Sequence, residues 1–178
     1  MVIKEPIETP RLILKNLSIE DANSPYKDWV RDPEVNRYLE LRHSPPNESQ
    51  ISEFISSMNH SSDNLFLGIF LKNFTHIGNI KLGPINLSNH RAIIGLLIGD
   101  KSSWGRGYAS ESIEAISNYA FNHLKLNKVE AGCYSSNIGS YKAFLNAGFK
   151  HEGTLKNHWK IGNDWEDELL IGKSLELN

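Results

Sequence analysis

The sequence has a single cysteine, no long apolar run and no marked excess of charge of one sign. The lone Cys133 excludes an intramolecular disulfide and a metal site built from cysteines, and we expect it at a buried apolar position. The 19 basic residues nearly balance the 21 acidic ones, which argues against a nucleic-acid or anionic-membrane surface. No stretch approaches the ~20 apolar residues of a membrane span.

The N-terminus also lacks the features of a secretory signal. The opening residues "MVIKEPIETPRLILK" carry Lys4, Glu5 and Glu8 and have no apolar core. We therefore expect a cytoplasmic protein with no metal, nucleic-acid or membrane partner. A chain of 178 residues, 39% hydrophobic and 22% charged, has the size and composition of one globular domain. We expect this domain to span 1–178, with a core of about 9–177.

Strand and helix patterns alternate along the chain. Apolar alternation predicts strands at 11–16, 64–72, 76–85, 91–99 and 128–135, and a terminal hairpin at 153–161 and 164–175. Helical patterns cover 18–32, 33–40, 47–59 and the stretches after Gly107 and Asn137. Pro25 can divide the first of these helices. The order predicts an α+β fold in which one sheet carries helices on both faces.

The sequence predicts how the helix after Asn137 begins and ends. Asn137 is suited to the N-cap, and Gly148 is suited to the left-handed position that follows a helix. Phe149 can then pack back onto Phe144, the hydrophobic contact that accompanies such an end.

Residues 104–112 read "WGRGYASES" and place two glycines just before a predicted helix. A P-loop is excluded, since this segment has no Gly-Lys-Ser/Thr. A Rossmann fingerprint is disfavoured, because the third glycine is missing and the segment follows an antiparallel meander. Two alternatives remain. In the first, the free amides of the helix N-terminus and Arg106 bind an anion. In the second, the glycines only let the backbone change direction between the strand and the helix. The spacing alone supports both equally.

The segment resembles the pyrophosphate-binding loop of the GNAT superfamily, the acetyl-CoA-dependent N-acetyltransferases. Their pattern is Gln/Arg-x-x-Gly-x-Gly/Ala, and Trp104, Gly107 and Ala109 take its first, fourth and sixth positions. The variant of this loop with tryptophan in the first position resembles one branch of the family. That branch includes ribosomal-protein N-terminal acetyltransferases and some polyamine and amino-sugar acetyltransferases. Four further segments resemble that branch in the same order: "TPRLILKNLSIEDA", "DPEVNRYL", "NIGSYKAFLNAGFKHEGTLKNHW" and "GNDWEDELLIG".

The resemblance covers almost the whole chain and implies the GNAT fold, a mostly antiparallel sheet of about seven strands with helices on both faces. It also implies acetyl-CoA as cosubstrate. The strand end that would pair with the pantetheine amides comprises Leu97, Ile98 and Gly99. The residues that would hold the pyrophosphate are Trp104, Gly105, Arg106, Gly107, Tyr108, Ala109 and Ser110. Asn137 would contact the pantetheine arm, and Ser140 and Phe144 would line the thiol end.

Acetyl transfer to an amine needs a neutral amine, a stabilised oxyanion and a leaving thiolate. Many relatives protonate the thiolate with a tyrosine seven residues after the Asn, where this sequence has Phe144, which cannot donate. Ser140 is the branch's alternative and the group we expect at the thiol. The ordinary explanation is a first-turn serine bonded to the Asn137 cap. Tyr141 is a second candidate, although packing is the better explanation of it.

The general base is harder to assign. Relatives often carry a glutamate on the strand at 91–99, where this sequence has Ile93 and Ile94. His90 heads that strand and is our candidate base, directly or through water, although an exposed turn also accounts for it. Glu111 is expected to stabilise the start of the helix instead. Backbone amides beside the strand are the expected oxyanion donors.

The acceptor site is expected between the first helices and the terminal hairpin. Its candidate lining residues are Tyr38, His43, Trp159 and Trp165, each of which could equally be a core or surface residue. The sequence shows no concentrated acidic cleft, which disfavours polyamines. The predicted function is N-acetyl transfer, by direct attack in a ternary complex, to a protein N-terminal amine or a small molecule such as an amino sugar. A catalytically idle acyl-CoA-binding module is the alternative. The resemblance also implies that a homodimer can form.

Overall fold

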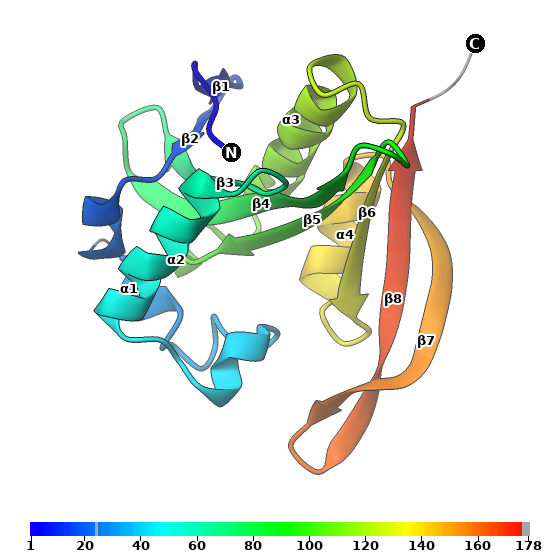
Figure 1. Cartoon of the computed structure of the whole chain (residues 1–178). Coiled ribbons are helices and arrows are strands. Elements are labelled where there is room, and N and C mark those ends of the chain that lie inside the picture. Colours follow the sequence, from blue (N-terminus) through cyan, green and yellow to red (C-terminus); the bar gives the residue numbers. More distant parts are fainter. Residues whose placement is uncertain (24, 176–178) are drawn as a thin grey trace.

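An eight-stranded sheet runs through the computed structural model, which describes residues 1–23 and 25–175 (Figure 1). Its strands are β1 (Ile7–Glu8), β2 (Leu12–Asn16), β3 (Leu65–Leu71), β4 (His76–Asn86), β5 (Arg91–Ile98), β6 (Lys128–Tyr134), β7 (Lys150–Ile161) and β8 (Asp164–Ser174). Their spatial order is β1-β2-β3-β4-β5-β6-β8-β7, and every neighbouring pair except β5 and β6 is antiparallel. The predicted α+β fold with a mostly antiparallel sheet is confirmed, and the two-residue β1 makes the strand count eight instead of seven.

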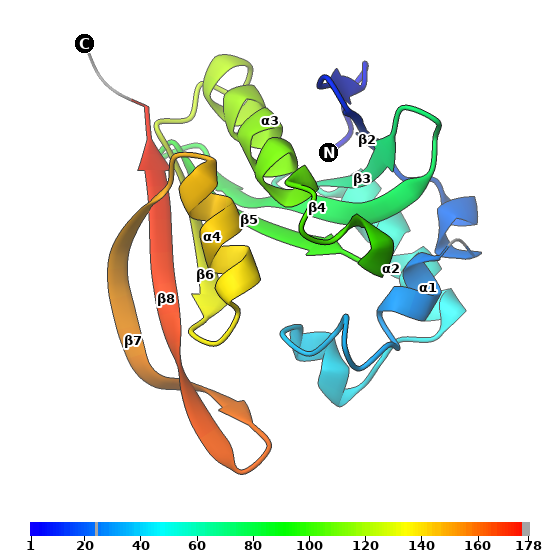
Figure 2. The ribbon, with the colours of Figure 1, turned by 180° about the vertical axis from the view of Figure 1, so that it is seen from behind.

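Helices cover both faces of the sheet, as predicted. On one face lie α1 (Tyr26–Trp29) and α2 (Glu48–His60), and on the other α3 (Tyr108–Asn122) and α4 (Ile138–Asn146) (Figures 1 and 2). Three short 3₁₀ helices connect these elements: η1 (Ile19–Asn23), η2 (Glu40–His43) and η3 (Lys101–Ser103).

Strand alternation divides the buried side chains into two cores. Leu12 and Leu14 of β2 belong to the core that includes Ile116 of α3. Ile13, between them, belongs to the core that includes Ile55 of α2. Successive side chains of a strand point to opposite faces, so one strand serves both cores.

The first helical region is divided. The sequence predicts a helix over 18–32, whereas the structure has η1 and then α1, with Pro25 at the N-cap of α1. Proline has no N–H and disfavours helical backbone in the residue before it. A continuous helix through Pro25 would therefore lose a backbone hydrogen bond and be less stable.

The predicted helix over 33–40 is wrong, because turns and bends occupy 33–39 and only the short η2 begins at Glu40. The buried Asn36 side chain donates to the carbonyl of Val30 at 2.8 Å. The Asp32 carboxylate accepts from the backbone N–H of Glu34 at 2.9 Å. Side chains that bond to nearby backbone groups compete with helix formation, and here the competing contacts prevail.

Helix α4 begins and ends as predicted. The side chain of Asn137 accepts from the backbone N–H of Ser140 at 3.2 Å. At the other end Gly148 has φ 85°, and the N–H of Phe149 donates to the carbonyl of Phe144 at 3.1 Å. The two phenylalanine rings pack with centroids 5.0 Å apart. These contacts confirm both the N-cap and the left-handed end with its hydrophobic contact.

The N-terminal segment packs against the core. Ile3 is buried under α3, and its N–H donates to the side chain of Asn16 at 3.1 Å. Buried residues therefore occur before residue 9, and the expected start of the domain core at about 9 stays a prediction. The expected end near 177 lies outside the described residues, and assignment of 1–178 to one domain stays a prediction.

Candidate active site

Strands β5 and β6 diverge partway along their length. They pair in parallel over three residues each, and Ile93 opposite Glu130 is the last pair. Beyond this pair β5 continues beside β4, and β6 continues beside β8 (Figure 2). Each strand therefore turns one unpaired edge toward the other. Such edges present rows of free backbone N–H and C=O groups to a ligand.

The register with β4 decides which backbone groups of β5 point to this opening. The N–H of Gly99 donates to the carbonyl of Ile77 in β4 at 2.9 Å. Because alternate residues of a strand direct their backbone groups to opposite edges, Leu97 also bonds toward β4, and Leu96 and Ile98 face the opening. Of the three residues expected to pair with pantetheine, the alternation turns Ile98 to the opening, next to Leu96, and the pantetheine contacts stay a prediction.

A capped turn carries the chain from β5 to the predicted phosphate loop. The Asp100 carboxylate accepts hydrogen bonds from the hydroxyls of Ser103 at 2.5 Å and Ser102 at 2.8 Å. The bond from Ser103 is the main cause that lowers the pKa of Asp100. Trp104 follows, half-exposed, and its indole N–H donates to the carbonyl of Ile98 at 2.7 Å. Trp104 thereby ties the start of the loop to the end of β5.

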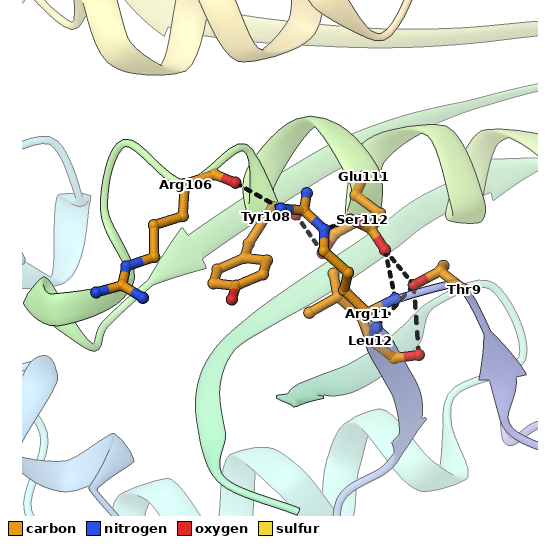
Figure 3. Close-up of polar contacts among 7 residues, drawn as sticks. All are labelled: Thr9, Arg11, Leu12, Arg106, Tyr108, Glu111 and Ser112. Atoms are coloured by element: carbon orange, nitrogen blue, oxygen red, sulfur yellow. Dashed lines mark hydrogen bonds and ion pairs between the residues drawn. The ribbon is translucent and has the colours of Figure 1, made fainter. Parts of the chain in front are cut away.

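The two glycines of the loop adopt left-handed backbone. Gly105 has φ 71° and Gly107 has φ 80°, a region that other residues enter at a cost of roughly 1–2 kcal/mol. Gly107 is the N-cap of α3 and makes no side-chain cap bond. The amides of the first helical turn are therefore left for another acceptor. Arg106, between the glycines, turns its side chain away from the helix (Figure 3).

A brace of polar contacts connects the start of α3 to the segment before β2 (Figure 3). The guanidinium of Arg11 contacts Glu111 at 2.6 Å and donates to the carbonyl of Arg106 at 2.9 Å. The hydroxyl of Thr9 donates to Glu111 at 2.6 Å, and Arg11 lies over the ring of Tyr108 at 4.8 Å. Partial burial acts to raise the pKa of Glu111, but the hydrogen bonds from Thr9 and Arg11 hold it below its ordinary value. Glu111 thus anchors the loop as well as the helix end.

The start of α4 lies at the same end of the sheet as the loop, because β5 and β6 are parallel and each leads into its helix at its C-terminal end (Figure 2). Ser140 is in the first turn of α4, half-buried. Its N–H bonds to Asn137, and its hydroxyl makes no hydrogen bond within the described residues. Phe144 is buried in the core, 2% exposed, and Tyr141 faces His151. Ser140 and Tyr141 therefore each have a hydroxyl that makes no hydrogen bond within the described residues, whereas Phe144 has no polar group.

His90 lies in the turn before β5, with φ 49°, and its Nδ1 is 3.1 Å from the carbonyl oxygen of Lys125. At about 3.3 Å per residue, His90 is roughly 10 Å along the strand from Ile93, where β5 and β6 begin to diverge. A base must come within hydrogen-bond reach of the proton that it takes, so His90 could act here only through water. An exposed turn accounts for His90, and its role as base stays a prediction.

Aromatic rings gather at the end of β6, on the sheet face opposite α3 and α4. Tyr134 packs between Tyr38, at 5.5 Å, and Trp159, at 5.2 Å. The structure thus brings together two of the four predicted acceptor-site residues. The other two, His43 in η2 and Trp165 in β8, are exposed outside this stack. Sequence reasoning missed Tyr134, which reads as an ordinary strand residue.

The hydroxyl of Tyr134 is the centre of a charged contact. It donates to the carboxylate of Glu40 and accepts from the guanidinium of Arg42 at 2.8 Å. Burial, followed by the bond to Glu40, raises the pKa of Tyr134 to about 12. Arg42 also donates to the carbonyl of Lys160 at 3.1 Å. These bonds fix η2 against the terminal hairpin, and Tyr134 stays protonated at neutral pH.

Two more carboxylates lie on this face. Glu168 is opposite Tyr134 in the β6–β8 register, and Glu166 accepts from the hydroxyl of Ser136 at 2.7 Å. Glu40 also contacts Tyr134, but Arg42 pairs with Glu40 and His158 contacts Glu168. The expectation that no concentrated acidic cleft forms stays a prediction. Within the described part of the chain, no group of three or more His, Cys, Asp or Glu side chains could hold a metal ion.

A separate cleft of about 830 Å³ runs between the N-terminal segment and the outer face of α3. It adjoins Glu111, but the predicted cofactor contacts do not line it. Among the described residues, no helix is long and apolar enough to cross a membrane.

Comparisons with known proteins agree with this geometry. The family model described as "Acetyltransferase (GNAT) domain" matches residues 11–150. The chain is similar to the N-acetyltransferase p20 of Bacillus licheniformis, with 33% identity over 161 residues, 88% of each chain. It superposes on a GNAT-family acetyltransferase from Bacillus anthracis with a TM-score of 0.81 and 24% identity, covering 95% of this chain and 98% of that one.

A further structural relative is a spermidine N-acetyltransferase from Vibrio cholerae, solved with CoA and spermine. Its TM-score is 0.84 at 19% identity, covering 93% of this chain and 96% of that one. The divergent parallel pair, the glycine-led start of α3 and the capped start of α4 are thus set in a fold shared with acetyltransferases. Together with the family match over most of its length, this shows that the chain is an acetyl-transferring enzyme of the GNAT family.

Proposed function

We propose that this enzyme transfers the acetyl group of acetyl-CoA to a primary amine by direct attack in a ternary complex. The observation that carries the proposal is the unpaired edge of β5 beside the start of α3. An extended amide chain such as pantetheine can pair with the backbone of Leu96 and with the N–H of Ile98, whose carbonyl accepts from Trp104, much as an added strand would. The CoA in the Vibrio cholerae structure supports the same cosubstrate here.

The loop from Trp104 to Ser110 is the proposed pyrophosphate site. Amides in the first turn of a helix, with the helix dipole, favour an anion. Gly107 brings the backbone close to it without a side chain, and Arg106 adds a positive charge. Asn137 is then the proposed contact to the pantetheine arm. Its carbonyl oxygen is engaged by the cap, so its amide group is the part that faces the arm.

The chemistry makes separate demands on amine, carbonyl and thiolate. An alkyl amine with a pKa of ~10.4 is mostly charged at neutral pH, whereas an α-amine at ~8 needs less help to lose its proton. Backbone N–H groups on the open edge of β5 are the proposed donors to the carbonyl oxygen. Ser140, with its free hydroxyl, is proposed to contact the sulfur and assist its protonation.

The acceptor is proposed to be a protein N-terminal amine or an amino sugar. A polyamine is a second candidate, because the three carboxylates grouped near Tyr134 attract cations and the Vibrio cholerae relative was solved with spermine. The idle-module alternative has less support, since relatives that match along most of their length are named N-acetyltransferases. A homodimer and a cytoplasmic location stay predictions.

Coenzyme A release with a panel of amines tests the proposal. The panel comprises a short peptide with a free N-terminus, glucosamine and spermidine, each offered with acetyl-CoA. Amine-dependent release of free thiol from at least one member is the expected result. Saturable acetyl-CoA binding without turnover on any member would overturn the proposed function and favour the idle module.

A further inference from the structure

The carboxylate of Glu168 lies across the backbone of β6 where that strand has left β5. A Cβ atom at Gly132 would overlap this carboxylate. Gly132 is two residues beyond Glu130, the last residue of β6 that pairs with β5. The missing side chain at Gly132 therefore makes the space in which the Glu168 carboxylate lies, beside the opening between the two strands.

Glu168 occupies the face of the sheet opposite the proposed cofactor site. Ala131 and Cys133 pack into the core beneath α3 and α4. Alternation then turns Gly132 and Tyr134 to the other face, which Glu168 shares as the residue paired with Tyr134. On that face α1 and α2 lie over the other half of the sheet (Figure 1). A carboxylate is thus placed where an amine can approach the opening from the side away from the cosubstrate.

An imidazole contacts this carboxylate from the terminal hairpin. Nε2 of His158 is 3.2 Å from Glu168, and the two side chains are 42% and 16% exposed. The β7–β8 register shifts between Leu155 and Trp159, and Asn157 there has φ 49°. Such a bulge allows neighbouring side chains to share a face.

Trp159 fixes the other side of the imidazole. The His158 and Trp159 rings meet edge to face at 4.8 Å, and Trp159 stacks on Tyr134. His158 is therefore held against Glu168 while part of its ring stays open to solvent.

We propose that Glu168 binds the acceptor amine and takes its proton, and that His158 passes this proton to solvent. The inference rests on the proposed function. The nitrogen lone pair forms a C–N bond to the acetyl carbon, the C–S bond breaks, and its electron pair leaves with the sulfur. Before this step, the ammonium proton goes to the Glu168 carboxylate and through His158 to water, which frees the lone pair. The second proton, lost by the nitrogen once the C–N bond has formed, follows the same path. The thiolate takes a proton from Ser140 or water, which regains one from solvent.

The test compares Glu168→Gln and His158→Gln with the unmodified protein, using the amine of the panel that it acetylates. Glu168→Gln keeps the shape but cannot accept a proton, and we expect kcat to fall about 100-fold with unchanged acetyl-CoA affinity by calorimetry. His158→Gln should lose less, and its loss should shrink between about pH 7 and about pH 9, where solvent supplies the neutral amine. A merely structural role would lower activity equally across this range.

Matched controls separate local chemistry from charge and folding. Asp164→Asn removes one negative charge from the same strand, and His60→Gln removes an imidazole at the end of α2; both should keep full activity. Gly132→Ala should reproduce the defect of Glu168→Gln, because its methyl group displaces the carboxylate. Near-normal kcat in Glu168→Gln would overturn this inference and leave the proposed function intact. Failure of the unmodified protein on every amine would overturn both.

Discussion

The guanidinium of Arg11 lies 2.6 Å from the carboxylate of Glu111, 100 residues later in the chain. The same guanidinium donates to the carbonyl of Arg106, inside the proposed phosphate loop. One ion pair therefore connects the N-terminal strand to the backbone that has to meet the pyrophosphate. Because Arg11 is half-exposed, solvent screens the pair, and we expect its main effect on loop geometry more than on global stability.

Glu111→Gln should weaken acetyl-CoA binding. Loss of the charge-assisted bonds from Arg11 and Thr9 frees the loop, at a cost of about 1 kcal/mol, or about fivefold in Kd. Calorimetric titration with acetyl-CoA measures this change. Glu8→Gln, which breaks an exposed ion pair with Lys72, is the matched control and should bind normally. Equal affinity in both variants would contradict the bracing role.

Stability should depend on the ionisation of Glu111 at acidic pH. Its pKa is held below the ordinary value of 4.5 in the folded protein, so its contribution is complete above that value. The contribution is lost as pH falls through the lower, folded-state pKa. Urea unfolding measured across this acidic range gives the free energy of unfolding at each pH. As pH falls, this free energy should decline less in Glu111→Gln than in the unmodified protein. An identical decline in both proteins would show that this carboxylate has no linkage to folding.

Gly107→Asp should abolish acetyl-CoA binding, because it adds a negative charge where the pyrophosphate is proposed to lie. Gly107→Ala tests the effect of backbone strain without added charge, since a residue with a Cβ at φ 80° loses about 1–2 kcal/mol of stability. Gly162→Ala places the same kind of strain in the distant hairpin turn, where φ is 60°, and should leave binding unchanged. Undiminished affinity in Gly107→Asp would refute the location of the site.

Ser140→Ala should lower kcat with little effect on folding. The N-cap bond of α4 uses the backbone N–H of Ser140, which alanine retains, so the melting temperature should hold. Removal of the hydroxyl takes away the proposed thiol contact, a loss of roughly 100-fold if it supplies the proton. Asn137→Ala is the contrasting variant and should cost about 1 kcal/mol of stability through the lost cap. Wild-type turnover in Ser140→Ala would assign the proton to water.

The sequence predicted best those elements whose ends are set by residues nearby in the chain. Helix α4 is specified by Asn137 and Gly148 within a few residues of its ends, and its contacts are as expected. The helix predicted over 33–40 fails because Asn36 reaches back to the carbonyl of Val30, a contact that periodicity cannot show. The sequence likewise places His90 only next to β5, and its role as base stays a prediction.

By itself, the sequence determined most of the order of strands and helices, the glycine turn before α3 and the resemblance to acetyl-CoA-dependent enzymes, because periodicity, caps and short motifs act over neighbouring residues. Tertiary structure alone decided where β5 and β6 part, which backbone groups face that opening and which side chains surround it. Arg11 with Glu111, and Tyr134 with Glu40 and Glu168, come from distant segments. Strand pairing and register bring such residues together, and both depend on the packing of the whole sheet.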